Sequence, residues 1–259
     1  MDPTSFDRQA PTFDARAGLP DGALAAMARA VAVEVLSPAA GWLVEVGAGT
    51  GRLGRRLEEA CGAYVAFDGS FEMLSRTTWA SAPRVQADGR KPWPFADGSA
   101  RAVFASRALH LFEPEHAARQ TMRLLGPRSG TALLLASRRR AAESVSERLR
   151  REMRRRLAKQ GIFGKARGRF EKRLFEHCCQ QGAAVIEPVA VSSWNSTVTP
   201  ADAIANWRSK EGLAGRAVSP AVQAEVLEQL TAWAETEFGD LAEPREVTMA
   251  YVLTGVRWS

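Results

Sequence analysis

Short apolar runs alternate with longer amphipathic segments along the first half of the chain. Runs such as 41–46 and 63–68 are apolar almost throughout, which is typical of strands buried on both faces. The segments between them carry apolar residues at helical spacing, and two of them end at a glycine. The pattern predicts strands over 41–46, 63–68, 83–88, part of 100–112 and 130–137, and helices over 21–36, 51–62, 70–80 and 114–126. Such alternation predicts an α/β fold with a doubly wound, mostly parallel sheet.

After residue 137 this rhythm breaks. The basic stretch 138–173 is predicted to be helical and to continue as helix to Gly182. Two further strands are expected over 183–191 and 246–258, which brings the sheet to seven strands, with a helical stretch between them that turns at 212–220. The domains expected are a core of 1–137 and 183–259, a helical cap insert of 138–182 and a helical substrate-side segment of 200–240.

The predicted cap carries a narrow apolar stripe. One apolar residue recurs per turn, at Val145, Leu149, Met153 and Leu157. A stripe of this width predicts loose packing, and the cap is expected to be mobile. Its hinge points would be the glycines 161, 164 and 168.

Charge is concentrated in the same stretch. Residues 138–173 hold 15 Lys or Arg against four Glu, a net charge of +11, whereas the whole chain has +6 and the remainder therefore −5. The basic insert is open to four interpretations: a solvated helix face, a grip on an anionic small substrate, a surface for an acidic protein partner, or a site for RNA. Nucleic acid is the less favoured partner, because few aromatic residues interleave with the basic ones.

Composition sets the remaining bounds. The chain has 259 residues, of which 46% are apolar, enough to bury a full core. It contains no apolar run of 18 residues, so no membrane span is expected. Its three cysteines are an odd number and include a vicinal pair, which favours a reducing compartment. The N-terminal residues lack a basic patch followed by an apolar stretch, so a cytoplasmic location is expected.

The first predicted strand runs into a glycine-rich turn, in "WLVEVGAGTGRLGRRL" over 42–57. Turns of this kind, at the carboxyl end of a parallel strand, bind nucleotide cofactors. The dinucleotide pattern G-x-G-x-x-G would place glycine at 52, but this chain has Arg52 and the spacing G-x-G-x-G. Glu45 precedes the first glycine by two residues and suits a cationic amino-acid group better than a pyrophosphate. Asp68, 21 residues beyond Gly47, stands where an acid holds ribose hydroxyls.

These residues belong to a longer resemblance. "VEVGAGTGRL", "AFDGSFEML", "VQADGRKPWPFADGSARAVFAS", "RALHLF" and "LLGPRSGTALL" resemble successive motifs of the class I S-adenosylmethionine-dependent methyltransferases, in particular the type 11 group. "FDRQAPTFDARAGLP" resembles the N-terminal segment that folds over the cofactor in that group. The resemblance covers roughly residues 4–137, is weaker over 183–259, and implies a Rossmann-like methyltransferase fold with S-adenosylmethionine as cofactor.

The resemblance also implies roles for individual residues. The glycine loop would line the methionine and ribose moieties, Glu45 would orient that loop or the amino group, and Asp68 would bind the ribose. Asp88 would meet the adenine amine, and Ser106 with Arg107 would face the methionine end. The full expected cofactor set is Phe13, Arg16, Glu45, Gly47, Ala48, Gly49, Gly51, Asp68, Gly69, Met73, Asp88, Gly89, Arg90, Ser106 and Arg107.

The chain departs from the group at Phe13, Ala100–Arg101 and Leu111, where Tyr, Phe-Asp and Trp are common. These departures concern the substrate more than the cofactor. His110 is predicted to be a catalytic base or a substrate anchor, with a packed core histidine as the equal alternative. Trp194, Trp207 and Tyr251 are candidates for walls of the substrate pocket, with plain core as the alternative.

The expected function is therefore methyl transfer to a small molecule through an oxygen, nitrogen or carbon nucleophile. The acceptor is open to being anionic or bound to a carrier. Two alternatives remain: an RNA methyltransferase, and a cofactor-binding protein that regulates or scaffolds without catalysis. The histidines and cysteines share no metal-ligand spacing, so no metal is expected.

Overall fold

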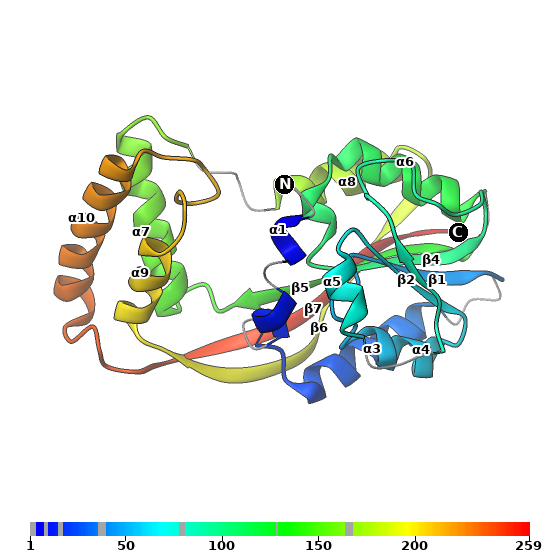
Figure 1. The fold of residues 1–259 in the computed structure, drawn as a ribbon, viewed down its shortest axis with the longest axis horizontal. Helices are drawn as coiled ribbons and strands as arrows, with labels where there is room; N and C mark the ends of the chain where they lie inside the picture. Colours follow the sequence, from blue (N-terminus) through cyan, green and yellow to red (C-terminus); the bar gives the residue numbers. More distant parts are fainter. Residues whose placement is uncertain are drawn as a thin grey trace. The chain divides into compact units, whose positions relative to one another are not determined.

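The structure is a computed structural model that describes residues 4–7, 10–14, 18–35, 40–77, 81–127, 129–163 and 168–259. Seven strands of the described ranges form one sheet in the order β3-β2-β1-β4-β5-β7-β6 (Figure 1). Their bounds are β1 Trp42–Val46, β2 Tyr64–Asp68, β3 Arg84–Gln86, β4 Ala100–Ser106, β5 Ala132–Arg140, β6 Ala183–Val198 and β7 Arg245–Trp258. The predicted α/β class and strand number are confirmed.

The sheet is mostly parallel, as predicted. Strands β1 and β2, β1 and β4, β2 and β3, and β4 and β5 pair in parallel. β7 runs antiparallel to β5: the amide of Gly130 donates to Trp258 O at 2.7 Å, and the amide of Ala141 to Thr248 O at 3.1 Å. The strand order reverses between β1 and β4, so the carboxyl ends of these two strands flank the position where such sheets bind ligands.

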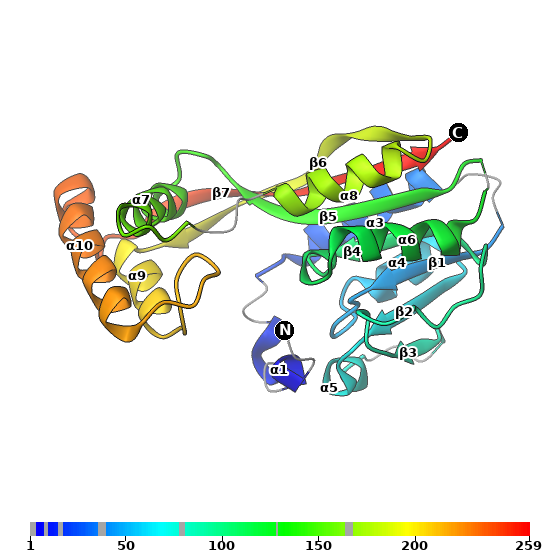
Figure 2. The same ribbon diagram turned by 90° about the horizontal axis from the view of Figure 1, so that it is seen from above.

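Helices cover both faces of the sheet. Figures 1 and 2 place α6 and α8 on one face, and α3 and α4 on the other. None of the described helices combines the length and the apolar character needed to cross a membrane. The helical bounds are α1 Thr4–Asp7, η1 Ala10–Thr12, α3 Asp21–Val35, α4 Gly54–Cys61, α5 Phe71–Ser75, η2 Leu109–Leu111, α6 Pro114–Leu125, α7 Val145–Lys159, α8 Arg169–Cys179, α9 Pro200–Arg208 and α10 Pro220–Phe238.

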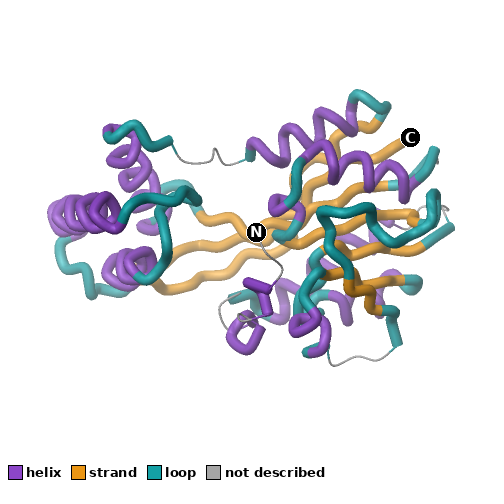
Figure 3. Tube along the Cα trace, turned by 45° about the horizontal axis from the view of Figure 1, so that its top comes forward, coloured by secondary structure: helices purple, strands orange, loops and turns teal. Residues whose placement is uncertain are grey.

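The chain divides into two compact units. Unit 1 comprises Met1–Arg138, Phe170–Ser192 and Tyr251–Ser259, and unit 2 comprises Arg139–Arg169 and Ser193–Ala250. Each unit has its own apolar core: β1, β4 and β5 contribute to the first, and α7, α9 and α10 to the second. The long strands β6 and β7 (orange in Figure 3) contribute residues to both units.

The expected loose packing of the apolar stripe on α7 is wrong. Its four residues are at most 6% exposed, and two of them, Leu149 and Leu157, are fully buried. They pack with apolar residues of α9, α10 and β7, including Ile204, Val226 and Leu230. Because two helices pack against α7, a stripe one residue wide per turn is enough to bury it.

The predicted insert does not form one continuous helix. β5 extends to Arg140, α7 ends at Lys159, and α8 starts at Arg169 and contributes to the core of unit 1. Of the glycines expected as hinges, Gly161 and Gly168 have positive φ angles, and Gly164 lies outside the described residues. The role of 138–182 as a cap, and that of 200–240 as a substrate-side segment, stay predictions.

Candidate active site

The glycine turn after β1 is tied to the end of β2. The amides of Gly47 and Ala48 both donate to the carbonyl of Phe67, at 2.8 and 3.2 Å. Gly47, Gly49 and Gly51 all have positive φ angles, between 59° and 76°, a region that favours glycine. A Cβ on Gly47 would lie 2.1 Å from Ala108 Cβ. The sequence therefore needs glycine here both for the turn and for the approach of the chain after β4.

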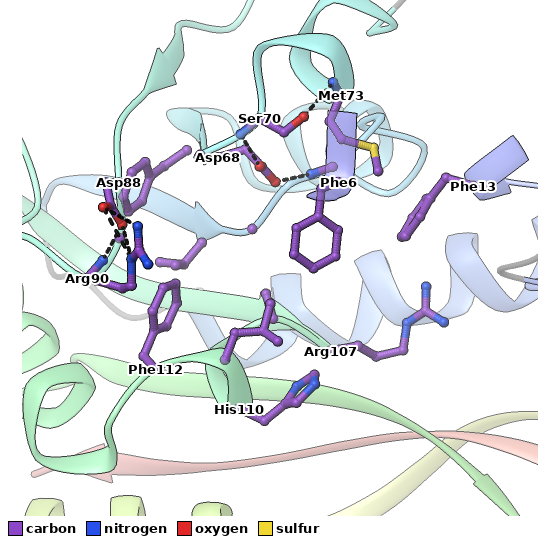
Figure 4. A pocket seen from close by; sticks show the side chains of 18 residues that line it. Phe6, Phe13, Asp68, Ser70, Met73, Asp88, Arg90, Arg107, His110 and Phe112 are labelled. Atoms are coloured by element: carbon purple, nitrogen blue, oxygen red, sulfur yellow. Dashed lines mark hydrogen bonds and ion pairs between the residues drawn. The ribbon is translucent and has the colours of Figure 1, made fainter. Parts of the chain in front are cut away.

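Asp68 at the end of β2 organises the opposite wall. Its Oδ2 accepts the amide of Gly49 and its Oδ1 the amide of Ser70, both at 2.8 Å. Ser70 caps α5, because its Oγ accepts the amide of Met73 at 3.1 Å (Figure 4). Burial raises the pKa of Asp68, and these backbone hydrogen bonds partly offset the rise. Each carboxylate oxygen retains a lone pair that can accept a ligand hydroxyl.

These walls enclose a cavity of about 470 Å³, within the range of small-molecule sites. Ten of the predicted cofactor residues line it: Phe13, Gly47, Gly49, Asp68, Gly69, Met73, Asp88, Gly89, Arg90 and Arg107. His110 lines it as well. The other lining residues are Phe6, Val46, Phe67, Ser70, Ala108, Leu111 and Phe112.

Several predicted site residues lie elsewhere. Glu45 is buried beneath the turn, where Tyr64 Oη donates to its Oε2 at 2.5 Å, and burial raises its pKa to about 8. Tyr251 is fully buried and its Oη lies 2.6 Å from Ser106 Oγ. Trp194 and Trp207 pack against the core of unit 2. Ala48 and Gly51 belong to the turn without lining the cavity, and Arg16 lies outside the described residues.

A second corner of the cavity follows β3. Asp88 accepts a forked pair of hydrogen bonds from Arg90, with Nε to Oδ1 at 2.9 Å and Nη2 to Oδ2 at 2.8 Å. The guanidinium lowers the pKa of Asp88 to about 2, so this carboxylate is ionised at neutral pH. The carbonyl of Gly89 is held by Trp93 Nε1 at 3.0 Å and His116 Nε2 at 2.9 Å. A Cβ on Gly89 would lie 2.6 Å from the tip of the Phe112 ring, so a larger residue here would have to displace that ring.

The N-terminal segment supplies one wall of the cavity, and the sequence predicted only part of this wall. Phe6 and Phe13 both line the cavity (Figure 4), but only Phe13 was predicted. The aspartate that follows each of these phenylalanines accepts a hydrogen bond from elsewhere in unit 1. Asp7 accepts from Ser70 Oγ, and Asp14 accepts from Thr50 Oγ1 at 2.6 Å. The Phe-Asp pair repeats after seven residues, and this repeat is the signal that points to Phe6.

The loop after β4 brings two nitrogen-bearing side chains to the cavity. Arg107 has a φ angle of 61°, unusual for a residue other than glycine. His110 lies on the short helix η2, and its side chain is exposed. The alternative of a packed core histidine is therefore wrong. Figure 4 shows both side chains on the same side of the cavity, opposite Asp68 and Met73.

Comparison with known protein families decides the class of this site. Residues 44–133 match a family model described as a methyltransferase domain, of type 11. Over these residues the chain has the methyltransferase domain of S-adenosylmethionine-dependent enzymes. Its methyl donor is S-adenosylmethionine, as predicted. No curated protein sequence matches this methyltransferase.

Solved structures share the fold of this methyltransferase. The YcgJ protein of Bacillus subtilis is 14% identical with a TM-score of 0.52, over 90% of this chain and 98% of that one. A candidate methyltransferase from Bacillus halodurans is 17% identical with a TM-score of 0.52, over 88% and 98%. A candidate type II methyltransferase from Anaeromyxobacter dehalogenans is 13% identical with a TM-score of 0.53, over 88% and 95%. At these identities the likeness concerns the fold.

The described residues contain no cluster of three or more His, Cys, Asp or Glu side chains that could hold a metal ion. The donors and acceptors that line the cavity are instead backbone amides, two carboxylates and the side chains after β4. A nucleoside with a charged amino-acid tail has groups of matching chemistry, because its ribose hydroxyls need acceptors and its tail needs polar contacts.

Proposed function

We propose that this methyltransferase transfers the methyl group of S-adenosylmethionine to a small molecule. The observation that carries the proposal is the cavity of about 470 Å³ at the switch point of the sheet. Its volume suits a ligand of the cofactor's size together with part of a small acceptor. The two sides of the cavity differ in charge. One side carries the carboxylates that follow β2 and β3, and the other carries the nitrogen-bearing side chains of Arg107 and His110, which follow β4.

In this proposal the carboxylate side holds the cofactor. The bare backbone of Gly47 and Gly49 lets the ligand approach closely, and Asp68 accepts hydrogen bonds from the ribose hydroxyls. Met73 and Phe67 supply apolar surface for the adenine near Asp88. Glu45 acts from beneath the turn, by fixing Tyr64, rather than by touching the ligand. The cofactor supplies a methyl group that its sulfonium sulfur already activates.

The work left to the protein is to position the acceptor. A nucleophile held in line behind the methyl group at about 3–3.5 Å gains roughly 7–11 kcal/mol from positioning alone. The rings of Phe6, Phe13 and Phe112 give this cavity an apolar wall that keeps water out. If the nucleophile is a hydroxyl, we assign His110 as the base that takes its proton. His110→Ala should then lower turnover roughly 10²- to 10⁴-fold at nearly unchanged affinity for S-adenosylhomocysteine.

The charge pattern of α7 supports a small acceptor over RNA. Arg148 pairs with Glu237, Arg151 with Glu143, and Arg156 with Glu152. Arg155 and Arg150 also form ion pairs within α7. Much of the positive charge of this helix is thus balanced within unit 2, which weakens both RNA and an acidic protein as partners. A purely regulatory role fits less well, since side chains do not fill the cavity and apolar rings make up much of its lining.

One experiment separates these alternatives. The protein would be incubated with S-adenosylmethionine that carries a tritiated methyl group, together with host-cell extract divided into metabolites below 1 kDa, RNA and protein. We expect label in the metabolite fraction. Label in RNA alone would favour the RNA alternative, and no transfer by a protein that binds the cofactor would favour the non-catalytic one.

The cofactor assignment has its own test. Asp68→Ala removes an acceptor for charged hydrogen bonds, worth roughly 1.5–3 kcal/mol, so affinity for S-adenosylhomocysteine should fall about 10- to 100-fold. Calorimetry would measure this loss, with NAD as the ligand expected not to bind. Binding of NAD without binding of S-adenosylhomocysteine would refute the proposed site. Asp68→Asn is the matched variant, because it keeps one acceptor oxygen for the loop.

A further inference from the structure

Arg107 carries a charge that no ion pair balances among the described residues. No ion pair joins its guanidinium to any described carboxylate, and its Nε is buried without a hydrogen-bond partner. The two carboxylates of the cavity are engaged elsewhere, Asp68 by the amides of Gly49 and Ser70 and Asp88 by Arg90. A buried donor of this kind is costly unless water or a ligand completes it, and Arg107 differs from the other arginines in this state because it lines the cavity.

The backbone holds this side chain at the cavity against its own preference. Arg107 is one of only two described residues other than glycine with a positive φ angle. Its amide donates to Ala136 O at 3.2 Å, and the preceding Ser106 is hydrogen-bonded to the buried Tyr251. Backbone strain of this kind persists where the surroundings impose it and is concentrated at ligand sites.

The surroundings of the guanidinium indicate the shape of the missing ligand. Arg107 Cζ lies 6.0 Å from the centre of the Phe13 ring, and Leu111 and Phe112 line the same cavity. Figure 4 shows the guanidinium on the side of Phe13 and His110, away from Asp88 and Arg90. A planar, forked cation beside aromatic rings suits a carboxylate attached to an apolar body.

We propose that Arg107 binds a carboxylate of the methyl acceptor, so that the acceptors of this enzyme are small apolar carboxylic acids. This inference rests on the proposed function, because it assigns the acceptor end of the same cavity. The carboxylate of the cofactor's methionine moiety has the same chemistry, and the experiment is designed to tell the two sources apart.

The first measurement uses simple probes. Benzoate and its neutral isostere benzamide would be titrated into the complex of the protein with S-adenosylhomocysteine. We expect benzoate to bind the wild-type complex at least 10-fold more tightly than benzamide. Arg107→Gln should abolish this preference and Arg107→Lys should retain part of it. Arg119→Gln, an exposed arginine of α6, removes the same charge outside the cavity and should leave the preference unchanged.

A second variant guards against misfolding. Arg107→Gly suits the positive φ angle, so it should fold at least as well as the wild type and raise the melting temperature. It should nevertheless lose the preference for benzoate. A higher melting temperature together with a lost preference for benzoate would show that Arg107 serves binding and costs stability. If Arg107 were purely structural, the glycine variant would have a lower melting temperature.

The source of the carboxylate is tested with two nucleosides. Methylthioadenosine lacks the amino-acid tail of S-adenosylhomocysteine, and Arg107→Gln should change the affinity for both by less than threefold. A 10-fold loss confined to S-adenosylhomocysteine would assign Arg107 to the cofactor and overturn the inference. So would benzoate binding that is absent or independent of Arg107. Failure of the wild type to bind S-adenosylhomocysteine would instead overturn the proposed function.

Discussion

Two constraints act on Gly47, the positive φ angle of the turn and the close packing against Ala108. An alanine there would need the φ angle of 73° and would bring its Cβ to 2.1 Å from Ala108 Cβ. Gly62 has nearly the same φ angle, 77°, but no atom lies within 4 Å of its added Cβ. Gly62→Ala should therefore cost only the backbone strain of about 1–2 kcal/mol, and Gly47→Ala a further 1–3 kcal/mol, roughly, for overpacking. Equal losses in urea unfolding would contradict the close contact.

Glu45 gives the fold a dependence on pH. Burial raises its pKa from 4.5 to about 8, so between these values the folded protein binds more protons than the unfolded chain. The free energy of unfolding should thus fall as the pH rises from about 4.5 to about 8, by up to about 1.4 kcal/mol per unit. Glu45→Gln should flatten this slope, and the remainder would report Asp68, whose pKa is also raised.

The control for this prediction is Glu59→Gln, since Glu59 lies exposed on α4 and forms a surface ion pair with Arg55. Denaturant unfolding at intervals of half a pH unit would measure both slopes. A wild-type stability that does not change between pH 5 and 8 would show that Glu45 ionises normally in the folded state. The same slope in wild type and Glu45→Gln would assign the effect to other groups.

At the scale of single residues, the sequence predicted most of the cavity lining but left two roles open for Glu45. The glycines of the turn and Asp68 could be predicted because backbone geometry and strand position constrain them. Glu45 could not be placed, since its hydrogen-bond partner Tyr64 lies diagonally across the β1–β2 pair, where Leu43 is opposite Tyr64 and Glu45 opposite Ala66. Which groups meet across two strands depends on register, and one sequence does not reveal it.

At the scale of elements, hydrogen bonds to two aspartates anchor the N-terminal segment. Ser70 Oγ donates to Asp7, and Thr50 Oγ1 donates to Asp14, so both aromatic walls stand beside an anchored residue. The double variant Asp7→Ala, Asp14→Ala should free Phe6 and Phe13 and weaken binding of S-adenosylhomocysteine about 10-fold or more. Protease cleavage within the first 20 residues should become faster, and S-adenosylhomocysteine should protect less.

Asp21→Ala is the matched control for these anchors. Asp21 is exposed and pairs with Arg52 at the surface. Such exposed ion pairs stabilise a fold by only about 0–1 kcal/mol. Its removal should change the affinity less than threefold. If the double variant is cut faster but binds S-adenosylhomocysteine as tightly as the wild type, the anchors order the segment without shaping the site.

Helix α7 shows the limit of prediction from periodicity at this scale. The helix itself was predicted, because apolar residues recur every four positions from Val145 to Leu157. The burial of this helix was not predicted, because the width of an apolar stripe indicates how much surface a single neighbouring helix can cover. Two helices, α9 and α10, pack against α7. The opposing surfaces come from residues 41 or more positions further along the chain, since α7 ends at Lys159 and α9 begins at Pro200, and local periodicity does not reveal which segments pair in the fold.

At the scale of the whole molecule, the sheet was predicted more fully than its division into units. Seven strands and their mostly parallel pairing follow from the alternation of elements. The extension of β6 from the predicted residue 191 to Val198 does not, because its second half lacks a consistent apolar alternation. Trp194, in that extension, is partly buried and packs against the core of unit 2. Its expected role as a wall of the substrate pocket stays a prediction.

Two separate cores predict two unfolding steps. Calorimetric scanning resolves such steps by their response to ligand and mutation. S-adenosylhomocysteine should raise the midpoint of the step that belongs to unit 1, because the residues proposed to bind it all lie there and a ligand stabilises only the state that binds it. Leu149→Ala, at a fully buried position of α7, should lower only the other midpoint, at a cost of roughly 2–5 kcal/mol. Leu124→Ala, fully buried in the core of unit 1, is the converse control. A single transition that all three changes move together would mean that β5, β6 and β7, which contribute to both units, couple the two cores into one cooperative structure.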